Sequence, residues 1–222
     1  MRFQRLALKL AVSASVLVLV SVPAGCSSSG SSTGLPSQAP LSSSSTKPDS
    51  FGFATNKRYG FSLRYPLGWL SAAFRPLPGG KSGGPLMVTS WADPKGKQVD
   101  GHYIDALQVT VFELNKPVTE ADVAEHAADF KVICGEMMVE QLGKNPHIAI
   151  SDPFRPVTVN GTMGFQITYS YLVDGTPTGA MSYLLPKGRY VYWVTGQASA
   201  NTWSMAWSML APAMASFAIK PT

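Results

Sequence analysis

The stretch MGFQITYSYLVDGTPTGAMSYLLPKGRYVYWVT, from Met163 to Thr195, contains three runs rich in β-branched and aromatic residues. Asp174-Gly175 separates the first run from the second, and Pro186-Lys187-Gly188 separates the second from the third. Apolar runs joined by short turns of this kind are typical of antiparallel neighbours. The stretch therefore predicts an antiparallel meander with strands at Met163–Val173, Thr178–Leu185 and Arg189–Thr195.

Three strands are predicted upstream of this meander. Phe61–Tyr65 alternates apolar and polar residues before Pro66, which predicts a strand that proline ends. Leu86–Trp91 is a short strand between the glycine-rich loop Pro78–Pro85 and the loop Asp93–Lys97. Ile104–Glu113 alternates over a longer run and predicts a longer strand.

A change of period marks a helix in mid-chain. Thr119 is an N-cap residue with an acidic residue, Asp122, at the N3 position. An apolar stripe at spacings of three and four follows it, which predicts one amphipathic helix that ends near Gly143; the stripe consists of Val123, Ala127, Phe130, Cys134 and Met137.

A second helix is predicted near the C-terminus. Trp203, Trp207, Leu210 and Met214 recur at helical spacing. Pro212 lies inside this pattern, and we expect a kink or a break there because proline removes a backbone donor.

The N-terminal 25 residues have the three parts of a secretory signal peptide. Arg2, Arg5 and Lys9 precede or open the apolar run Leu10–Val22, and Pro23-Ala24-Gly25 leads into Cys26. The four residues from Pro23 to Cys26 resemble the bacterial lipobox, with Pro23 in place of the usual aliphatic residue. The resemblance implies that Cys26 receives a diacylglycerol and becomes the new N-terminus; the alternative is an ordinary secreted protein with an unmodified Cys26.

The residues after Cys26 predict a tether and one domain. Residues 26–50 are rich in serine and poor in charge and aromatic residues, a composition that favours a flexible tether with an r.m.s. span of about 25–30 Å. Residues 51–222 are enough for one domain with one core. With Cys26 lipidated, Cys134 has no disulfide partner.

Charge argues against nucleic acid as a partner. The formal net charge of +5 falls to +2 when residues 1–25 are removed, and no cluster of basic residues remains. Attachment to a membrane would therefore depend on the lipid, and two acyl chains suffice for stable attachment.

The segment Tyr59-Gly60-Phe61-Ser62-Leu63-Arg64-Tyr65-Pro66, followed by Gly68-Trp69, resembles the N-terminal motif of the PsbP-like family. The order of elements up to Ser216-Phe217 also fits that family. The resemblance implies an α+β fold with a central antiparallel sheet flanked by helices on both faces, a PsbP-like α/β/α sandwich. The family includes a photosystem II extrinsic subunit, a Ran-binding protein and many bacterial lipoproteins, so membership implies a binding scaffold more than an enzyme.

Candidate functional residues each have a simpler structural role. We expect the aromatic residues of the N-terminal motif and of the last helix to pack in the core, and Cys134 to be a buried, inert thiol. His102, His126 and His147 lack metal-ligand spacing, so a metal site at Asp100 and His102 is less favoured than a solvated loop. No motif of a nucleophile, metalloprotease or phosphate-binding loop is present.

The sequence thus favours an envelope-anchored lipoprotein on the extracytoplasmic face of a bacterial membrane, with a non-catalytic domain that binds a protein or envelope component. It predicts no catalytic residues, no cofactor and no metal. The alternative is a carrier for a small apolar ligand between sheet and helix, in a cavity lined by methionines; these would be Met137, Met138, Met205, Met209 and Met214. A pure binder should have an exposed apolar patch at a sheet edge or in the Pro78–Pro85 loop.

The lipid anchor can be tested by expressing the wild-type chain and Cys26→Ala in a bacterial host. We expect intact-mass measurement to find a diacylglycerol-sized increment in the wild type only, and Cys26→Ala to move from the membrane to the soluble fraction. A wild type that is unmodified and freely secreted would contradict the anchor.

Overall fold

The computed structural model describes residues 50–74, 85–99, 102–141 and 147–220. The expected signal peptide, Cys26 and almost all of the tether lie outside these residues, as do most of the Pro78–Pro85 loop, Asp100 and Gly143. Among the described residues, no helix is long and apolar enough to cross a membrane.

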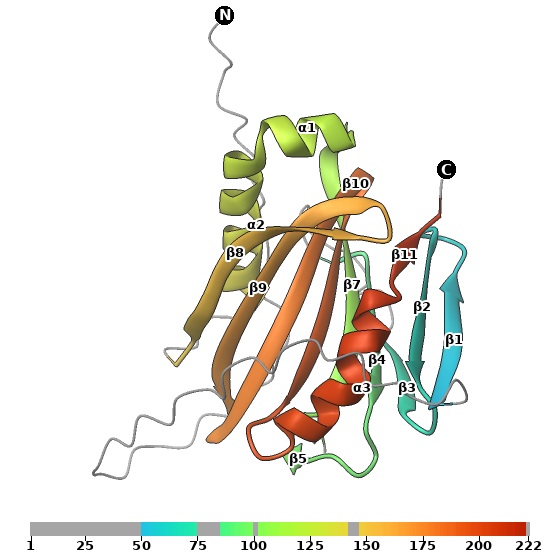
Figure 1. Ribbon diagram of the computed structural model, residues 1–222, viewed down its shortest axis with the longest axis vertical. Helices are drawn as coiled ribbons and strands as arrows, with labels where there is room; N and C mark the ends of the chain where they lie inside the picture. Colours follow the sequence, from blue (N-terminus) through green and yellow to red (C-terminus); the bar gives the residue numbers. More distant parts are fainter. Residues whose placement is uncertain (1–49, 75–84, 100–101, 142–146, 221–222) are drawn as a thin grey trace, which may run out of the picture.

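The main sheet is antiparallel throughout (Figure 1). Its order is β3 (Leu70–Phe74), β4 (Met87–Ala92), β7 (Ala106–Val118), β10 (Thr176–Ser199), β9 (Thr162–Val173) and β8 (Ala149–Val159). The predicted strands Leu86–Trp91 and Ile104–Glu113 correspond to β4 and β7.

The long run β10 folds back on itself. The backbone N–H of Ala200 donates to the carbonyl oxygen of Pro177 at 2.8 Å, and the hydroxyl oxygens of Ser182 and Thr195 are 2.8 Å apart. Gly188 has a φ of +58°, which a tight turn requires and glycine adopts at no steric cost. The first half of β10 pairs with β9 and the second half with β7, so the predicted meander is confirmed.

A second, three-stranded sheet has the order β1 (Phe51–Asn56), β2 (Phe61–Pro66) and β11 (Ala218–Ile219). β2 is the predicted strand Phe61–Tyr65. β5 (Gln98–Val99) and β6 (His102–Tyr103) pair as a short antiparallel sheet of two strands. Both strands lie between β4 and β7 in the sequence. The sequence did not predict β1, β3, β5, β6, β8 or β11.

The helix predicted in mid-chain is two helices. α1 (Glu120–Glu125) ends at His126, whose φ of −110° and ψ of 31° are not helical, and α2 (Ala127–Gln141) follows. The N-cap is confirmed: the backbone N–H of Asp122 donates to Thr119 Oγ1 at 3.2 Å, and the backbone N–H of Thr119 donates to Asp122 Oδ2 at 2.7 Å. Hydrogen bonds from the Thr119 side chain and backbone hold the pKa of Asp122 below its usual value.

The C-terminal helix α3 (Trp203–Ala215) continues through Pro212, so of the expected kink or break the break does not occur. Pro212 lies in the last turn, where its missing N–H removes one hydrogen bond only. The side-chain amide of Asn160 donates to the carbonyl oxygens of Ala215 and Phe217, both at 2.9 Å, and so binds carbonyls at the C-terminal end of α3.

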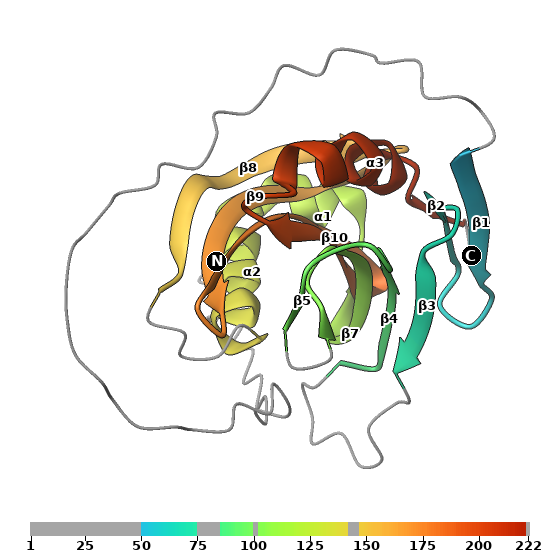
Figure 2. The same ribbon diagram turned by 90° about the horizontal axis from the view of Figure 1, so that it is seen from below.

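Two apolar cores lie on the two faces of the main sheet, with α1 and α2 on one side and α3 on the other (Figure 2). In the second half of β10, Val191 and Trp193 belong to the core under α2, whereas Tyr192 and Val194 belong to the core under α3. The predicted α+β architecture, an antiparallel sheet flanked by helices on both faces, is therefore confirmed.

The aromatic residues of the N-terminal motif pack in the core, as predicted. Tyr59 and Phe61 are buried, and Tyr65 stacks on Trp91 with ring centroids 5.4 Å apart. Trp203 and Trp207 stack on each other at 5.1 Å and are partly buried against the core under α3.

Two glycine substitutions should change stability in opposite directions. A Cβ on Gly164 would clash with the carbonyl oxygen of Leu184, so we expect Gly164→Ala to lower the free energy of unfolding by about 1–3 kcal/mol. A Cβ on Gly135 in α2 would lie 3.7 Å from the Phe154 ring, and we expect Gly135→Ala to raise it by up to about 1 kcal/mol. Urea unfolding of both variants measures this, and a Gly164→Ala as stable as the wild type would contradict the close packing of β9 on β10.

Candidate functional site

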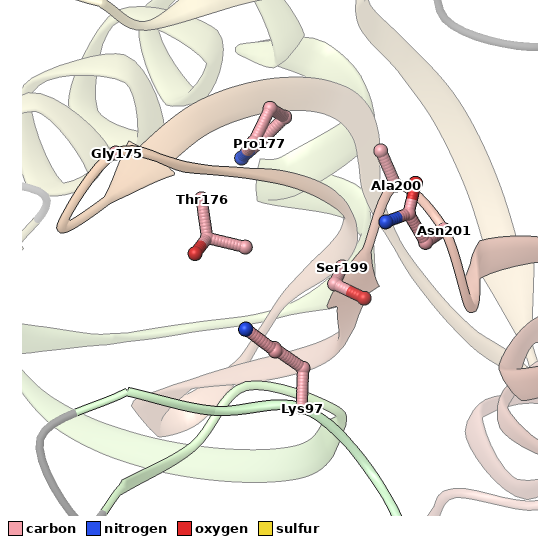
Figure 3. Close-up of a pocket in the computed structure, with 7 residues that line it drawn as sticks. All are labelled: Lys97, Gly175, Thr176, Pro177, Ser199, Ala200 and Asn201. Atoms are coloured by element: carbon pink, nitrogen blue, oxygen red, sulfur yellow. The ribbon is translucent and has the colours of Figure 1, made fainter.

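A hollow of about 240 Å³ lies at one end of the main sheet. Three segments line it: Lys97 before β5, Gly175 with the first two residues of β10 (Thr176 and Pro177), and the last residue of β10 (Ser199) with Ala200 and Asn201 after it. Figure 3 shows the Lys97 amine and the Thr176 hydroxyl turned toward the same space. The side chains that line the hollow therefore offer a cation, hydroxyls and an amide to a bound group.

Hydrogen bonds hold the three segments in place. The backbone N–H of Ser199 donates to Asp105 Oδ1 at 2.8 Å, and Asp105 is almost fully buried. The Ser199 hydroxyl lies 2.8 Å from that of Thr202, and the N–H of Ile104 donates to the carbonyl oxygen of Lys97 at 2.8 Å. The hollow is thus built on a fixed backbone, which is what a binding site needs for a defined geometry.

The loop before β5 is fixed by turns of its own. The backbone N–H of Asp93 donates to the carbonyl oxygen of Asp105 at 2.9 Å, and Asp93 Oδ1 accepts from the backbone N–H of Lys95 at 2.9 Å. Gly96 passes so close to Asp105 that a Cβ on it would lie 2.8 Å from the Asp105 Cβ. Lys97 therefore starts from a well-determined backbone position, although its side chain is exposed.

A chain of uncharged polar side chains continues from the hollow along the sheet face that α2 covers. Ser199, Gln197 and Thr195 alternate along β10 on this face. The Tyr171 hydroxyl donates to Gln197 Oε1 at 2.9 Å, and Gln197 Nε2 donates to the carbonyl oxygen of Ile104 at 3.0 Å. We call these four side chains, together with Ser182 and Tyr169, the hydroxyl chain.

The inner end of the hydroxyl chain lies beneath the helices. The Thr195 hydroxyl pairs with that of Ser182, which lies 3.3 Å from the Tyr169 hydroxyl. Beyond them the same face becomes apolar, at Leu184 and Val191. The indole N–H of Trp193, also on this face, is buried without a hydrogen-bond partner.

Burial decides the charge state of the two tyrosines in the hydroxyl chain. It raises the pKa of Tyr169 to about 12, although the hydrogen bonds with Ser182 and Thr195 oppose the shift. Burial also raises the pKa of Tyr171, with a smaller contribution from Tyr169. Both phenols stay neutral at physiological pH, so they donate and accept hydrogen bonds rather than act as bases.

Cys134 is confirmed as a buried thiol. It lies in the core under α2, and burial raises its pKa to about 12, which leaves too little thiolate for reactivity. His126 lies 4.0 Å from Glu125 and 3.9 Å from Asp129 on an exposed surface. The side chain of His102 lies outside the described residues, and within the described part of the chain no three His, Cys, Asp or Glu residues gather as metal ligands.

The five methionines do not line one cavity. Met137 and Met138 are buried in the core under α2, whereas Met214 is buried in the core under α3, on the opposite face of the sheet. Met205 is 68% exposed. The expected methionine-lined cavity between sheet and helix is therefore wrong for this set of residues.

Exposed apolar side chains do occur at sheet edges. Phe53 on β1 is 67% exposed, and Ile150 on the edge strand β8 is 52% exposed. These are single side chains on two different sheets and do not by themselves make the apolar patch expected of a binding protein, because single exposed apolar residues are common on protein surfaces.

The residues of the hollow and of the hydroxyl chain were not predicted from the sequence. One signal could have found part of them: the α2 face of β10 is apolar at Val191 and Trp193 and polar at Thr195, Gln197 and Ser199. Such a switch within one strand indicates that the inward face changes its environment. The contribution of Asp105 and Lys97 depends on tertiary contacts and leaves no local pattern.

No protein-family model matches the chain, and no curated protein matches it. Among solved structures, cyanobacterial PsbP (CyanoP) from Synechocystis sp. PCC 6803 is 14% identical, with 82% of this chain and 99% of that chain covered and a TM-score of 0.49. LpqN, involved in cell envelope biogenesis of Mycobacterium tuberculosis, is also 14% identical, with 79% and 88% covered and a TM-score of 0.40. Both similarities concern the fold at low identity.

The hydroxyl chain should matter for stability. Ser182→Ala removes the hydroxyl between Tyr169 and Thr195 and leaves both in a buried site without that partner, so we expect the free energy of unfolding to fall by about 1–3 kcal/mol. Ser204→Ala, at an exposed position of α3, is the control and should change it by less than about 0.5 kcal/mol. Equal urea midpoints for the two variants would contradict the role of Ser182.

Proposed function

We propose that the chain is a lipid-anchored protein of the bacterial envelope, whose domain binds an envelope component without catalysis. The hollow at the end of the main sheet is the binding site in this proposal, and the bound group carries hydroxyls, as the sugars of envelope polymers do. The observation that carries the proposal is the convergence of Lys97, Thr176, Ser199 and Asn201 on one hollow from three separate segments.

The anchor rests on the sequence Pro23-Ala24-Gly25-Cys26 and on the apolar run before it. A tether of about 25–30 Å would keep the domain close to the membrane and therefore close to envelope polymers. At that distance the effective concentration of an envelope ligand is high, and modest affinity is sufficient.

The chemistry of the hollow supports a polar, uncharged ligand. Its hydroxyl and amide groups can both donate and accept hydrogen bonds, which matches the hydroxyls of a sugar. Lys97 adds one cation. The hydroxyl chain behind the hollow is internally paired and holds the site rigid. Ser199 belongs to this chain and also lines the hollow, with its hydroxyl 2.8 Å from that of Thr202.

The volume sets the size of the bound group. About 240 Å³ is below the range of about 300–1,000 Å³ that is usual for pockets that enclose a whole small molecule. The hollow therefore suits one unit of a longer molecule, with the rest in solvent. A polymer of the envelope meets this condition better than a free apolar ligand that needs an enclosed cavity.

The experiment is co-sedimentation of the full-length chain, purified in detergent, with insoluble cell-wall polysaccharide from the expression host. We expect saturable binding by the wild type and an affinity about 3- to 10-fold weaker for Lys97→Met and for Asn201→Ala, since each removes about one hydrogen bond. Lys95→Met is the matched control, because Lys95 is exposed two residues away and does not line the hollow.

Two results would contradict the proposal. The first is no saturable binding by the wild type. The second is equal weakening by Lys95→Met and Lys97→Met, which would indicate general electrostatic attraction and not a site.

A further inference from the structure

Three hydrogen-bonding side chains form one row across three neighbouring strands. In the antiparallel register, Arg155 of β8 lies directly opposite Gln166 of β9, and Gln166 lies directly opposite Tyr183 of β10. Directly opposite residues in antiparallel strands point to the same face, with Cβ atoms about 4.5–5.5 Å apart. The three side chains therefore share one face of the main sheet, and we call them the donor row.

The middle of the donor row has an unsatisfied hydrogen-bond donor. Gln166 is 5% exposed, and its Nε2 atom is buried without a hydrogen-bond partner. A buried amide N–H without an acceptor costs about 1–3 kcal/mol, and native proteins leave few such groups. An acceptor at this position would remove that cost.

The two neighbours of Gln166 also favour an acceptor with negative charge. Arg155 carries five N–H donors, no acceptor and a permanent positive charge. It lies close enough to Tyr183 for its charge to lower the pKa of the phenol, against the larger effect of burial, which raises that pKa. Tyr183 thus keeps its proton at neutral pH and can donate it in a hydrogen bond.

We propose that the donor row binds a small oxyanion, a carboxylate or a phosphate group, whose oxygen atoms accept from Gln166 and its two neighbours. Such an anion satisfies the orphaned amide and adds charge-assisted hydrogen bonds to Arg155. This inference does not depend on the proposed function. The donor row lies on the α3 face of the sheet, where Tyr183 packs against the core under α3, whereas the hydroxyl chain lies on the α2 face.

One end of the donor row lies at the edge of the main sheet and is exposed. β8 is the edge strand of the main sheet, and Arg155 is exposed there, whereas Gln166 is buried further in. Pro156 follows Arg155, and a register shift precedes it between Asp152 and Arg155. An anion that binds the row would have to enter past β8, the labelled edge strand of the main sheet in Figure 1.

The test is thermal unfolding of the full-length chain in detergent at pH 7, with sodium acetate or sodium phosphate at an ionic strength matched by sodium chloride. We expect Tm to rise with the logarithm of the anion concentration once that concentration exceeds Kd, by about 3–6 °C at a tenfold excess over Kd. The rise should be lost in Gln166→Leu and Arg155→Gln and reduced in Tyr183→Phe, which removes only the hydroxyl. Arg58→Gln, at an exposed position of the β1–β2 turn, is the matched control and should keep it.

The outcomes distinguish a carboxylate from a phosphate, and two of them overturn the inference. A rise with acetate but not phosphate assigns a carboxylate, and the reverse assigns a phosphate. A rise that is the same in all variants is a general salt effect and overturns the site, as does no rise with either anion. Gln166→Leu removes the orphaned amide, so we expect it to fold, and Tyr183→Phe provides a second variant that retains the packing.

Discussion

The fold depends on strands that bury both faces at once. Val191 and Trp193 pack under α2, and Tyr192 and Val194, one residue apart from them, pack under α3. A shift of the register by one residue would send each side chain to the wrong core, so the pairing of β10 with β7 and β9 is strongly specified. The helices on both sides, and every functional group on the two faces, take their positions from this alternation.

The polar groups lie where the apolar cores end. On the α2 face of β10, the apolar side chains of Val191 and Trp193 belong to the core. The polar side chains of Thr195 and Gln197 follow them toward the hollow. On the α3 face, the donor row runs inward from the edge strand β8 to β10. Both sets of side chains rise from paired strands and not from long loops, which fixes their directions more tightly than a loop would.

Much of this architecture could be predicted from periodicity alone, because the meander, β2, β4, β7 and α3 have unambiguous patterns. The strand β8 was missed because Pro153 and Pro156 are unfavourable in strands, and an edge position tolerates them. His126 breaks the mid-chain helix without any local signal. The hollow and the donor row could not be predicted, since the neighbours of Lys97 and Gln166 are set by tertiary contacts and cross-strand register.

The pairing of β2 with β11 joins the first part of the domain to its last residues. The N–H of Arg64 donates to the hydroxyl of Ser216, 152 residues further along, and Ser62 pairs with Ala218. Contacts of such high sequence separation form late and slow the folding of a chain. β2 therefore lacks one of its two strand neighbours until residues 218–219 have been synthesised, so the three-stranded sheet cannot be completed before the last strand of the domain emerges.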